Sequence, residues 1–233
     1  MKPLDAYAEL KALGSPIIET KDAATRLRMA PQNATRLLRD AERAGLVARL
    51  RRGLWLLDLA LDTQVIAPYL TAPYPAYISM WSALYAHDMI QQIPRSTYVA
   101  SVARTQLIPT RRGEFRIHHL TPDVFGGFTE KSPGRYLATA EKALFDSAYV
   151  RAVRRAFFST PELTVPPGFD LRDLDRWVAR IDSPQVKTLT RRLLDKALAV
   201  ATEGDSSRAQ AQDAAAAEAD MSEARRVRTE MDL

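Results

Sequence analysis

The segment that decides the fold is PQNATRLLRDAERAGLVARLRRGLWLL, residues 31–57. Proline is favoured at the first position of a helix and glycine just after its last, so Pro31 and Gly45 predict a helix from Pro31 to about Ala44. Two apolar, strand-prone runs then flank Arg51-Arg52-Gly53, where glycine supplies the positive φ that a hairpin turn needs. The segment therefore predicts a helix followed directly by a β-hairpin.

The preceding residues predict the elements that lead into this helix. Gly14 and Pro16 are expected to stop a first helix, and Thr20 is a good N-cap for a second one. The order helix, strand, helix, turn, helix, hairpin is typical of a winged helix-turn-helix, which we expect over residues 1–60. The expected elements before Pro31 are a helix over 4–13, a strand at Ile17-Ile18, a helix over 21–28 and a turn at Met29-Ala30.

The helix that begins at Pro31 is predicted to have two unlike faces at about 100° per residue. One face is apolar and can pack on the two preceding helices; it holds Ala34, Leu37, Leu38 and Ala41. The opposite face suits DNA, because amides and arginine near the helix start can read base edges while later arginines hold phosphates. A solvated face without a ligand is the alternative. The expected DNA-binding residues of this helix are Gln32, Asn33, Thr35, Arg36, Arg39 and Arg43.

The hairpin adds three arginines to the predicted DNA-binding site: Arg49, Arg51 and Arg52. Two adjacent arginines at a hairpin tip can reach neighbouring phosphates or the minor groove. The alternative is an ordinary polar turn.

The charge distribution agrees with a polyanionic partner. The net charge is +5 overall: +4 over residues 1–60, +1 over 61–150, +4 over 151–200 and −4 over 201–233. Arginine exceeds lysine, 26 to 7, and arginine favours bidentate contacts with phosphate and guanine.

The absence of cysteine excludes disulfides, thiolate metal sites and a cysteine nucleophile. Without an apolar run of about 18 residues or a signal-like start, we expect a cytoplasmic protein with no membrane span.

The rest of the chain predicts an α+β fold in three further parts. Residues 61–75 are expected to be a connector, residues 76–200 an α+β domain, and residues 201–233 an acidic, alanine-rich helical or mobile tail. The middle domain is expected to begin with a helix over 78–90 that has Met80, Trp81, Leu84 and Tyr85 inward, followed by strands at 97–102 and 114–120 and a loop-rich stretch over 122–134. Three further helices are expected: one over 140–157 capped by Thr139, one over 171–182 capped by Asp170, and one over 184–201 capped by Ser183.

Chemistry-bearing residues do not form a catalytic pattern, so we expect no enzyme activity, cofactor or metal. His118 and His119 are adjacent on a predicted strand and point to opposite faces, which disfavours shared metal ligation. Glu141 and Asp146 lie about 140° apart on a predicted helix and do not form a same-face carboxylate pair. Gly126-Gly127 lacks the context of a phosphate-binding loop and reads as a turn.

Several motifs together resemble the AbiEi family of antitoxin–transcriptional regulators. They are the wing LRRGLWLL, ISMWSALYAHDMIQQIPRSTYVA (78–100), FRIHHLTPDVFGGF (115–128) and ATAEKALFDSAYV (138–150), so the resemblance covers residues 1–150 well and 151–200 loosely. It implies a repressor that binds inverted repeats in its own operator through the N-terminal domain. It also implies a C-terminal domain that counteracts a co-encoded, nucleotidyltransferase-like toxin without a stable complex, as in type IV toxin–antitoxin systems.

Two other functions remain open from the sequence. The chain can be a stand-alone winged-helix transcriptional regulator whose second domain senses a ligand or mediates self-association. It can also be a nuclease fused to a DNA-binding module, although the carboxylate spacing argues against that. The identity of the neighbouring gene distinguishes the antitoxin from the stand-alone regulator.

Overall fold

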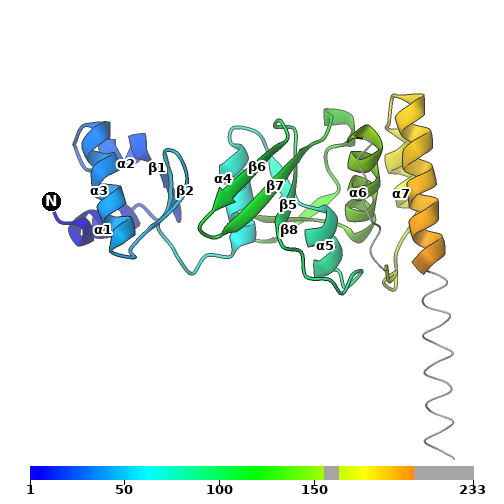
Figure 1. The fold of residues 1–233 in the computed structure, drawn as a ribbon, viewed down its shortest axis with the longest axis horizontal. Coiled ribbons are helices and arrows are strands. Elements are labelled where there is room, and N and C mark those ends of the chain that lie inside the picture. Colours follow the sequence, from blue (N-terminus) through cyan, green and yellow to red (C-terminus); the bar gives the residue numbers. More distant parts are fainter. Residues whose placement is uncertain (155–162, 202–233) are drawn as a thin grey trace, which may run out of the picture.

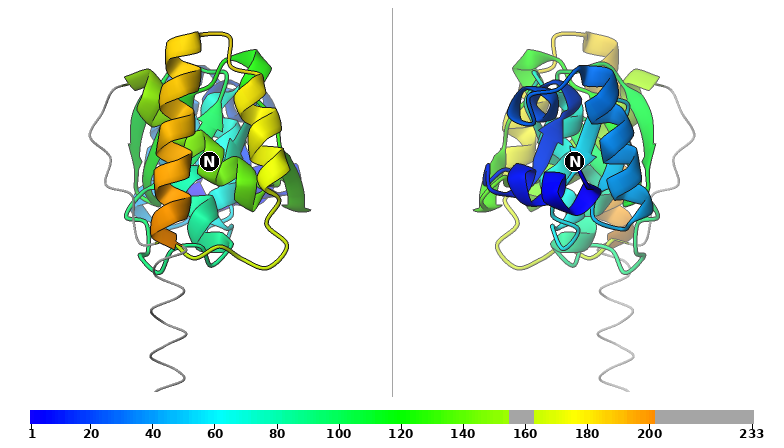
Figure 2. Two further views of the ribbon diagram at one scale, coloured as in Figure 1. Left: turned by 90° about the vertical axis from the view of Figure 1, so that its right-hand side faces the viewer. Right: turned by 90° about the vertical axis from the view of Figure 1, so that its left-hand side faces the viewer.

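The computed structural model describes residues 1–154 and 163–201 and is a mixed α+β protein with two β-sheets. Figure 1 shows an elongated body with the N-terminal segment at one end and the larger sheet in the middle. Helices α6 (Ala140–Arg154) and α7 (Leu171–Ala179) and the helix over 184–201 form the other end (Figure 2). The acidic tail predicted from residue 201 lies, except for Ala201, outside the described residues, as does the predicted end of the helix over 140–157.

The N-terminal elements follow the predicted order. The first sheet is antiparallel with the strand order β1-β3-β2, and Gly53 in the β2–β3 turn has a φ of +81°, as the hairpin prediction requires. The elements are α1 (Pro3–Lys11), β1 (Ile17–Glu19), α2 (Thr20–Arg26), α3 (Pro31–Arg43), β2 (Ala48–Arg51) and β3 (Leu54–Leu56).

The predicted N-cap at Thr20 is wrong. Glu19 occupies the N-cap position of α2, and no side chain caps the helix there. The Thr20 hydroxyl instead accepts a hydrogen bond from the indole N–H of buried Trp55 at 2.9 Å. A buried indole N–H requires a partner, so this tertiary contact replaces the local one.

The second sheet is mixed and has the strand order β6-β7-β5-β4-β9-β8. Strands β5 and β7 pair in parallel, as do β4 and β9, whereas the remaining neighbours are antiparallel. Its elements and the helices between them are η1 (Thr63–Ile66), α4 (Ala67–Thr71), β4 (Ala76–Ile78), α5 (Met80–Ala86), β5 (Thr97–Ser101), β6 (Gln106–Thr110), β7 (Gly113–His119), η2 (Pro122–Val124), β8 (Phe128–Ser132) and β9 (Arg135–Ala138).

Two predictions for the middle of the chain are wrong in detail. Residue 78 lies at the end of strand β4, so the helix predicted over 78–90 is shorter and begins at Met80; Tyr85, expected inward, is 41% exposed. The stretch over 122–134 is not simply a loop, since it contains η2 and β8. Strand β6 was not predicted; as an edge strand, it tolerates Pro109.

The caps predicted for the later helices are present. The Thr139 hydroxyl accepts the backbone N–H of Lys142 at 3.2 Å, and the Asp170 carboxylate accepts that of Arg172 at 2.9 Å. The Ser183 hydroxyl accepts the N–H of Val186 at a longer 3.4 Å. Side-chain oxygens thus satisfy N–H groups that have no partner within the helix.

The small sheet lies between two hydrophobic cores. Trp55 belongs to the smaller core together with residues of α1, α2 and α3, whereas its neighbours Leu54 and Leu56 belong to the larger core. Successive side chains on a strand point to opposite faces, so β3 is buried on both sides. Residues 61–75, expected to be a connector, contain η1 and α4, and they contribute Ile66 and Leu70 to the larger core.

Candidate nucleic-acid interface

Helix α3 packs with its apolar face inward, as the sequence predicts. Ala34, Leu38 and Ala41 are 2% exposed or less, and Leu37 is half-buried. Leu38 and Ala41 join residues of α1 and α2 in the smaller core. The opposite face of α3 is therefore turned toward solvent.

The exposed face of α3 carries most of the predicted DNA-binding side chains. Gln32, Asn33, Arg36 and Arg39 are all exposed, and among residues 1–154 and 163–201 neither of these arginines has an ion-pair partner. Uncompensated guanidinium groups on one helix face can attract phosphate.

Thr35 and Arg43 are less available than the other predicted residues of α3. The half-buried Thr35 donates its hydroxyl hydrogen to the carbonyl oxygen of Pro31 at 2.8 Å, so only the acceptor side of the hydroxyl is left for a ligand. Arg43 is exposed but pairs with Asp40 at 2.8 Å. A phosphate would have to share Arg43 with this carboxylate.

The β2–β3 hairpin places Arg51 and Arg52 in solvent at its turn, whereas Arg49 is half-buried. The Gly53 carbonyl accepts the backbone N–H of Thr20 at 2.9 Å, which holds the turn beside the start of α2. In Figure 1 the turn lies at the upper end of this segment, as does the chain between α2 and α3. The basic turn and the N-terminal end of α3 thus face the same side.

One acidic side chain connects α3, the hairpin and the second sheet. The Glu42 carboxylate accepts the backbone N–H of Arg49 at 3.0 Å and lies 3.3 Å from Nε of Arg111, in the β6–β7 turn. Local sequence patterns do not indicate this contact, because only the tertiary fold brings residues 42 and 111 together.

A second missed feature is a buried charged network in the middle of the chain. Lys142 and Asp146, one helical turn apart on α6, form an ion pair in which both side chains are 0% exposed. The Asp146 carboxylate also accepts hydrogen bonds from Ser79 (2.6 Å) and Tyr77 (3.0 Å). Burial lowers the pKa of Lys142 and raises the pKa of Asp146, and the ion pair opposes both shifts.

The aromatic surroundings close this network off from solvent. The Lys142 ammonium lies 4.5 Å from the ring centroid of Trp177 and 4.8 Å from that of Phe145. Gly127 packs so closely here that an added Cβ would lie 2.6 Å from a Trp177 ring carbon. Both charged side chains of this network are therefore enclosed by protein and paired with each other.

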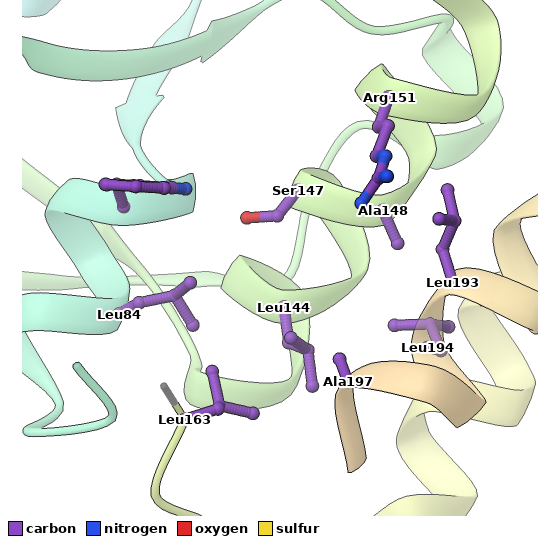
Figure 3. A pocket seen from close by; sticks show the side chains of 10 residues that line it. Leu84, Leu144, Ser147, Ala148, Arg151, Leu163, Leu193, Leu194 and Ala197 are labelled. Atoms are coloured by element: carbon purple, nitrogen blue, oxygen red, sulfur yellow. The ribbon is translucent and has the colours of Figure 1, made fainter. Parts of the chain in front are cut away.

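A separate, small apolar hollow of about 40 Å³ lies between α5, α6 and the helix over 184–201 (Figure 3). Its lining is mostly aliphatic and includes Leu84, Leu144 and Leu194. The Ser147 hydroxyl at its edge donates to the Ala143 carbonyl at 2.8 Å. The hollow therefore offers a mainly hydrophobic lining with few polar groups.

Within the described ranges, no three His, Cys, Asp or Glu side chains are grouped in a way that could hold a metal ion. No helix of those ranges has the length and apolar character that crossing a bilayer requires.

Compared with known proteins, the chain matches no protein-family model and no curated protein.

Proposed function

We propose that residues 1–57 are a winged helix-turn-helix and that the protein is a DNA-binding transcriptional repressor. Helix α3 would be the recognition helix and the β2–β3 hairpin the wing. The observation that carries the proposal is the division of α3, which buries Ala34, Leu38 and Ala41 while Arg36 and Arg39 remain in solvent. A basic turn facing the same side as the helix start supports it.

The proposed contacts differ along α3 and the wing. Gln32, Asn33, Thr35 and Arg36 enter the major groove, where amides suit adenine and arginine suits guanine. The remaining predicted arginines neutralise phosphates on either side of the groove. Among them, Arg43 contributes less than Arg39, because Asp40 already holds its guanidinium group. The phosphate-binding residues are Arg39, Arg43, Arg49, Arg51 and Arg52.

The antitoxin role is the second part of the proposal and rests on the resemblance to AbiEi-type regulators. In this role the protein represses its own operon by binding inverted repeats. Residues beyond the winged helix counteract a co-encoded nucleotidyltransferase-like toxin, without a stable complex between the two proteins. The stand-alone regulator is the competing proposal, and it shares the same DNA-binding behaviour.

Gel-shift titrations with purified protein test the DNA-binding part. The DNA is the region upstream of the gene, with a random duplex of equal length for comparison. Arg36→Ala should weaken the free energy of binding to the operator by about 1–3 kcal/mol and relax specificity at one base pair. Arg51→Ala should weaken binding to both duplexes and lower the salt slope by about one. Unchanged binding in both variants would refute the assignment.

Arg172→Ala is the matched control for these titrations. Arg172 is exposed on α7, at the far end of the molecule from α3 (Figure 1), so the variant makes the same change in net charge without touching the proposed site. We expect it to bind like the wild-type protein. A loss equal to that of Arg51→Ala would mean that net charge alone governs binding.

Co-expression tests the antitoxin part. If a nucleotidyltransferase gene adjoins this one, its product should stop growth when expressed alone, and the present protein should restore growth. Arg36→Ala should restore growth equally well when both genes are driven by independent promoters, because rescue does not require operator binding. Absence of such a neighbour, or failure to rescue, would favour the stand-alone regulator.

A further inference from the structure

The two sheets meet edge to edge. Strand β2 is an edge of the first sheet, β6 is an edge of the second, and the two strands are in contact. Leu50 of β2 and Ile108 of β6 are both buried in the larger core. We call the line along which the two strands meet the β2–β6 seam; apolar side chains fix the two halves of the molecule to each other there.

Arginines from both halves line the solvent side of the β2–β6 seam. A hollow of about 370 Å³ lies between Arg51 of the wing and Arg104 of the β5–β6 loop. A second hollow, of about 430 Å³, is lined by Arg49, Arg51 and Arg52 from the wing and by Arg111 from the β6–β7 turn. Arg51 lines both, so the two hollows adjoin.

The charge of the seam is strongly one-sided. Five arginines line the two hollows, and Glu42 is the one acidic residue among the residues lining them. Arg111 is partly compensated by Glu42 at 3.3 Å. Arg104 is exposed, and across residues 1–154 and 163–201 no carboxylate forms an ion pair with it.

We propose that the β2–β6 seam binds the sugar–phosphate backbone of operator DNA, so that Arg104 and Arg111 are DNA-binding residues outside the winged helix. The inference rests on the proposed function, because the wing must first meet the duplex. Arg51 then stands at the junction: it belongs to the wing tip and to both hollows. A DNA backbone held at the wing continues along the seam to the arginines of the second half, whose planar guanidinium groups match phosphate oxygens.

Arg104 should contribute more than Arg111, since Glu42 competes with phosphate for Arg111. At about 0.1 M salt, one phosphate contact corresponds to roughly a 5- to 10-fold change in affinity and to about one unit of the salt slope. We expect a loss of this size for Arg104→Ala, a smaller loss for Arg111→Ala, and a greater loss when both are replaced. Arg104→Lys, which retains the charge, should retain most of the salt slope.

The test measures fluorescence anisotropy of the full chain with two operator duplexes over a range of salt concentrations. One duplex ends at the bases protected by the winged helix, and the other extends by about ten base pairs, one helical turn, on each side. The losses should be seen with the longer duplex and be much smaller with the shorter one. Arg172→Ala serves as the charge-matched control, and a thermal melt verifies that each variant is folded.

The outcomes separate this inference from the proposed function. If Arg36→Ala loses operator binding while Arg104→Ala and Arg111→Ala have the wild-type affinity and salt slope on both duplexes, the seam inference is overturned and the winged-helix proposal stands. The seam then remains available to an acidic protein partner. If Arg36→Ala also binds normally, both fail. If Arg104→Lys has the same reduced salt slope as Arg104→Ala, charge is not the cause and the inference is likewise overturned.

Discussion

Glu42 and Arg111, 69 residues apart in the sequence, are joined by a 3.3 Å contact between a carboxylate oxygen and a guanidinium Nε. The same carboxylate oxygen accepts the backbone N–H of Arg49 at 3.0 Å. The C-terminal end of the proposed recognition helix, the wing and the second sheet therefore meet at one side chain. Glu42 orients these three parts, and it also places a negative charge within the surface proposed to bind DNA.

Replacement of that charge should strengthen DNA binding. Glu42→Gln keeps a side-chain oxygen that can accept the Arg49 N–H but removes the repulsion between carboxylate and phosphate. At about 8 Å in water this repulsion is roughly 0.5 kcal/mol, so we expect about two- to threefold tighter binding in anisotropy titrations at low salt. The gain should shrink as salt is raised. Weaker binding by a folded Glu42→Gln variant would contradict the proposed position of the DNA.

Replacing one partner of the buried pair of Lys142 and Asp146 should destabilise the protein strongly. Either Lys142→Met or Asp146→Asn leaves an uncompensated buried charge, which costs about 3–5 kcal/mol. The double variant should be less destabilised than the sum of the two single variants, with a coupling above about 1 kcal/mol in urea denaturation. Lys196→Met, at an exposed position, is the control and should change stability by less than about 0.5 kcal/mol. Additive losses would show that the pair does not act as a unit.

Gly127 should tolerate no side chain. Its φ is +69°, and an added Cβ would lie 2.6 Å from Trp177 and 2.9 Å from Lys142. Gly168 has a similar φ of +81° with no atom within 4 Å, so Gly168→Ala measures the backbone strain alone. We expect Gly168→Ala to lower the free energy of unfolding by about 1 kcal/mol and Gly127→Ala to lower it by about 2–4 kcal/mol, measured by thermal or chemical unfolding. Equal effects at the two positions would mean that the packing around Gly127 can relax.

His118 should make the protein less stable in mild acid. Burial, reinforced by Arg154 and Arg116, lowers the pKa of His118 from 6.5 to about 4. The folded protein thus binds this proton less tightly than the unfolded chain does, and unfolding takes up a proton between those pH values. Stability should therefore fall as the pH is lowered from about 6.5 toward 4, by at most about 3 kcal/mol.

His118→Phe isolates that contribution. The histidine ring stacks on Tyr98 with centroids 6.0 Å apart, and both of its buried ring nitrogens lack a hydrogen-bond partner among the described residues. Phenylalanine can keep the stacking and does not titrate. The difference in unfolding free energy between the two proteins should change across this pH range and be constant above it. A constant difference at every pH would show that His118 is protonated equally in both states.

Local patterns predicted α3 well, because its start, its end and its apolar face are all encoded within Pro31 to Gly45. The prediction of Thr20 as an N-cap was wrong for the opposite reason. Its hydrogen-bond partner Trp55 lies 35 residues away in the sequence, and the cap preference of a residue depends only on its immediate neighbours. The helix predicted from residue 78 failed similarly. Residues 76–78 form a strand only because β5 and β9 lie on either side of it.

The candidate interface was predictable only in part. The arginines of α3 and the wing lie within one short segment, so periodicity and turn chemistry identified them. Arg104 and Arg111 approach that segment through the contact of β2 with β6, which nothing in the local sequence indicates. Lys142 was missed although it lies one turn before Asp146, because its spacing on a helix does not reveal that both side chains are buried.

The small sheet, buried on both faces, determines how far the proposed recognition unit can be transplanted. A fragment that stopped after Leu57 would expose Ile17, Leu50, Leu54 and Leu56. Burial of each of these side chains contributes about 1.5–3 kcal/mol to the stability of the folded protein. Such a fragment should associate or precipitate unless those four positions are redesigned as polar. A chimeric protein that includes residues 1–57 must therefore also include the part of the second half that covers the small sheet.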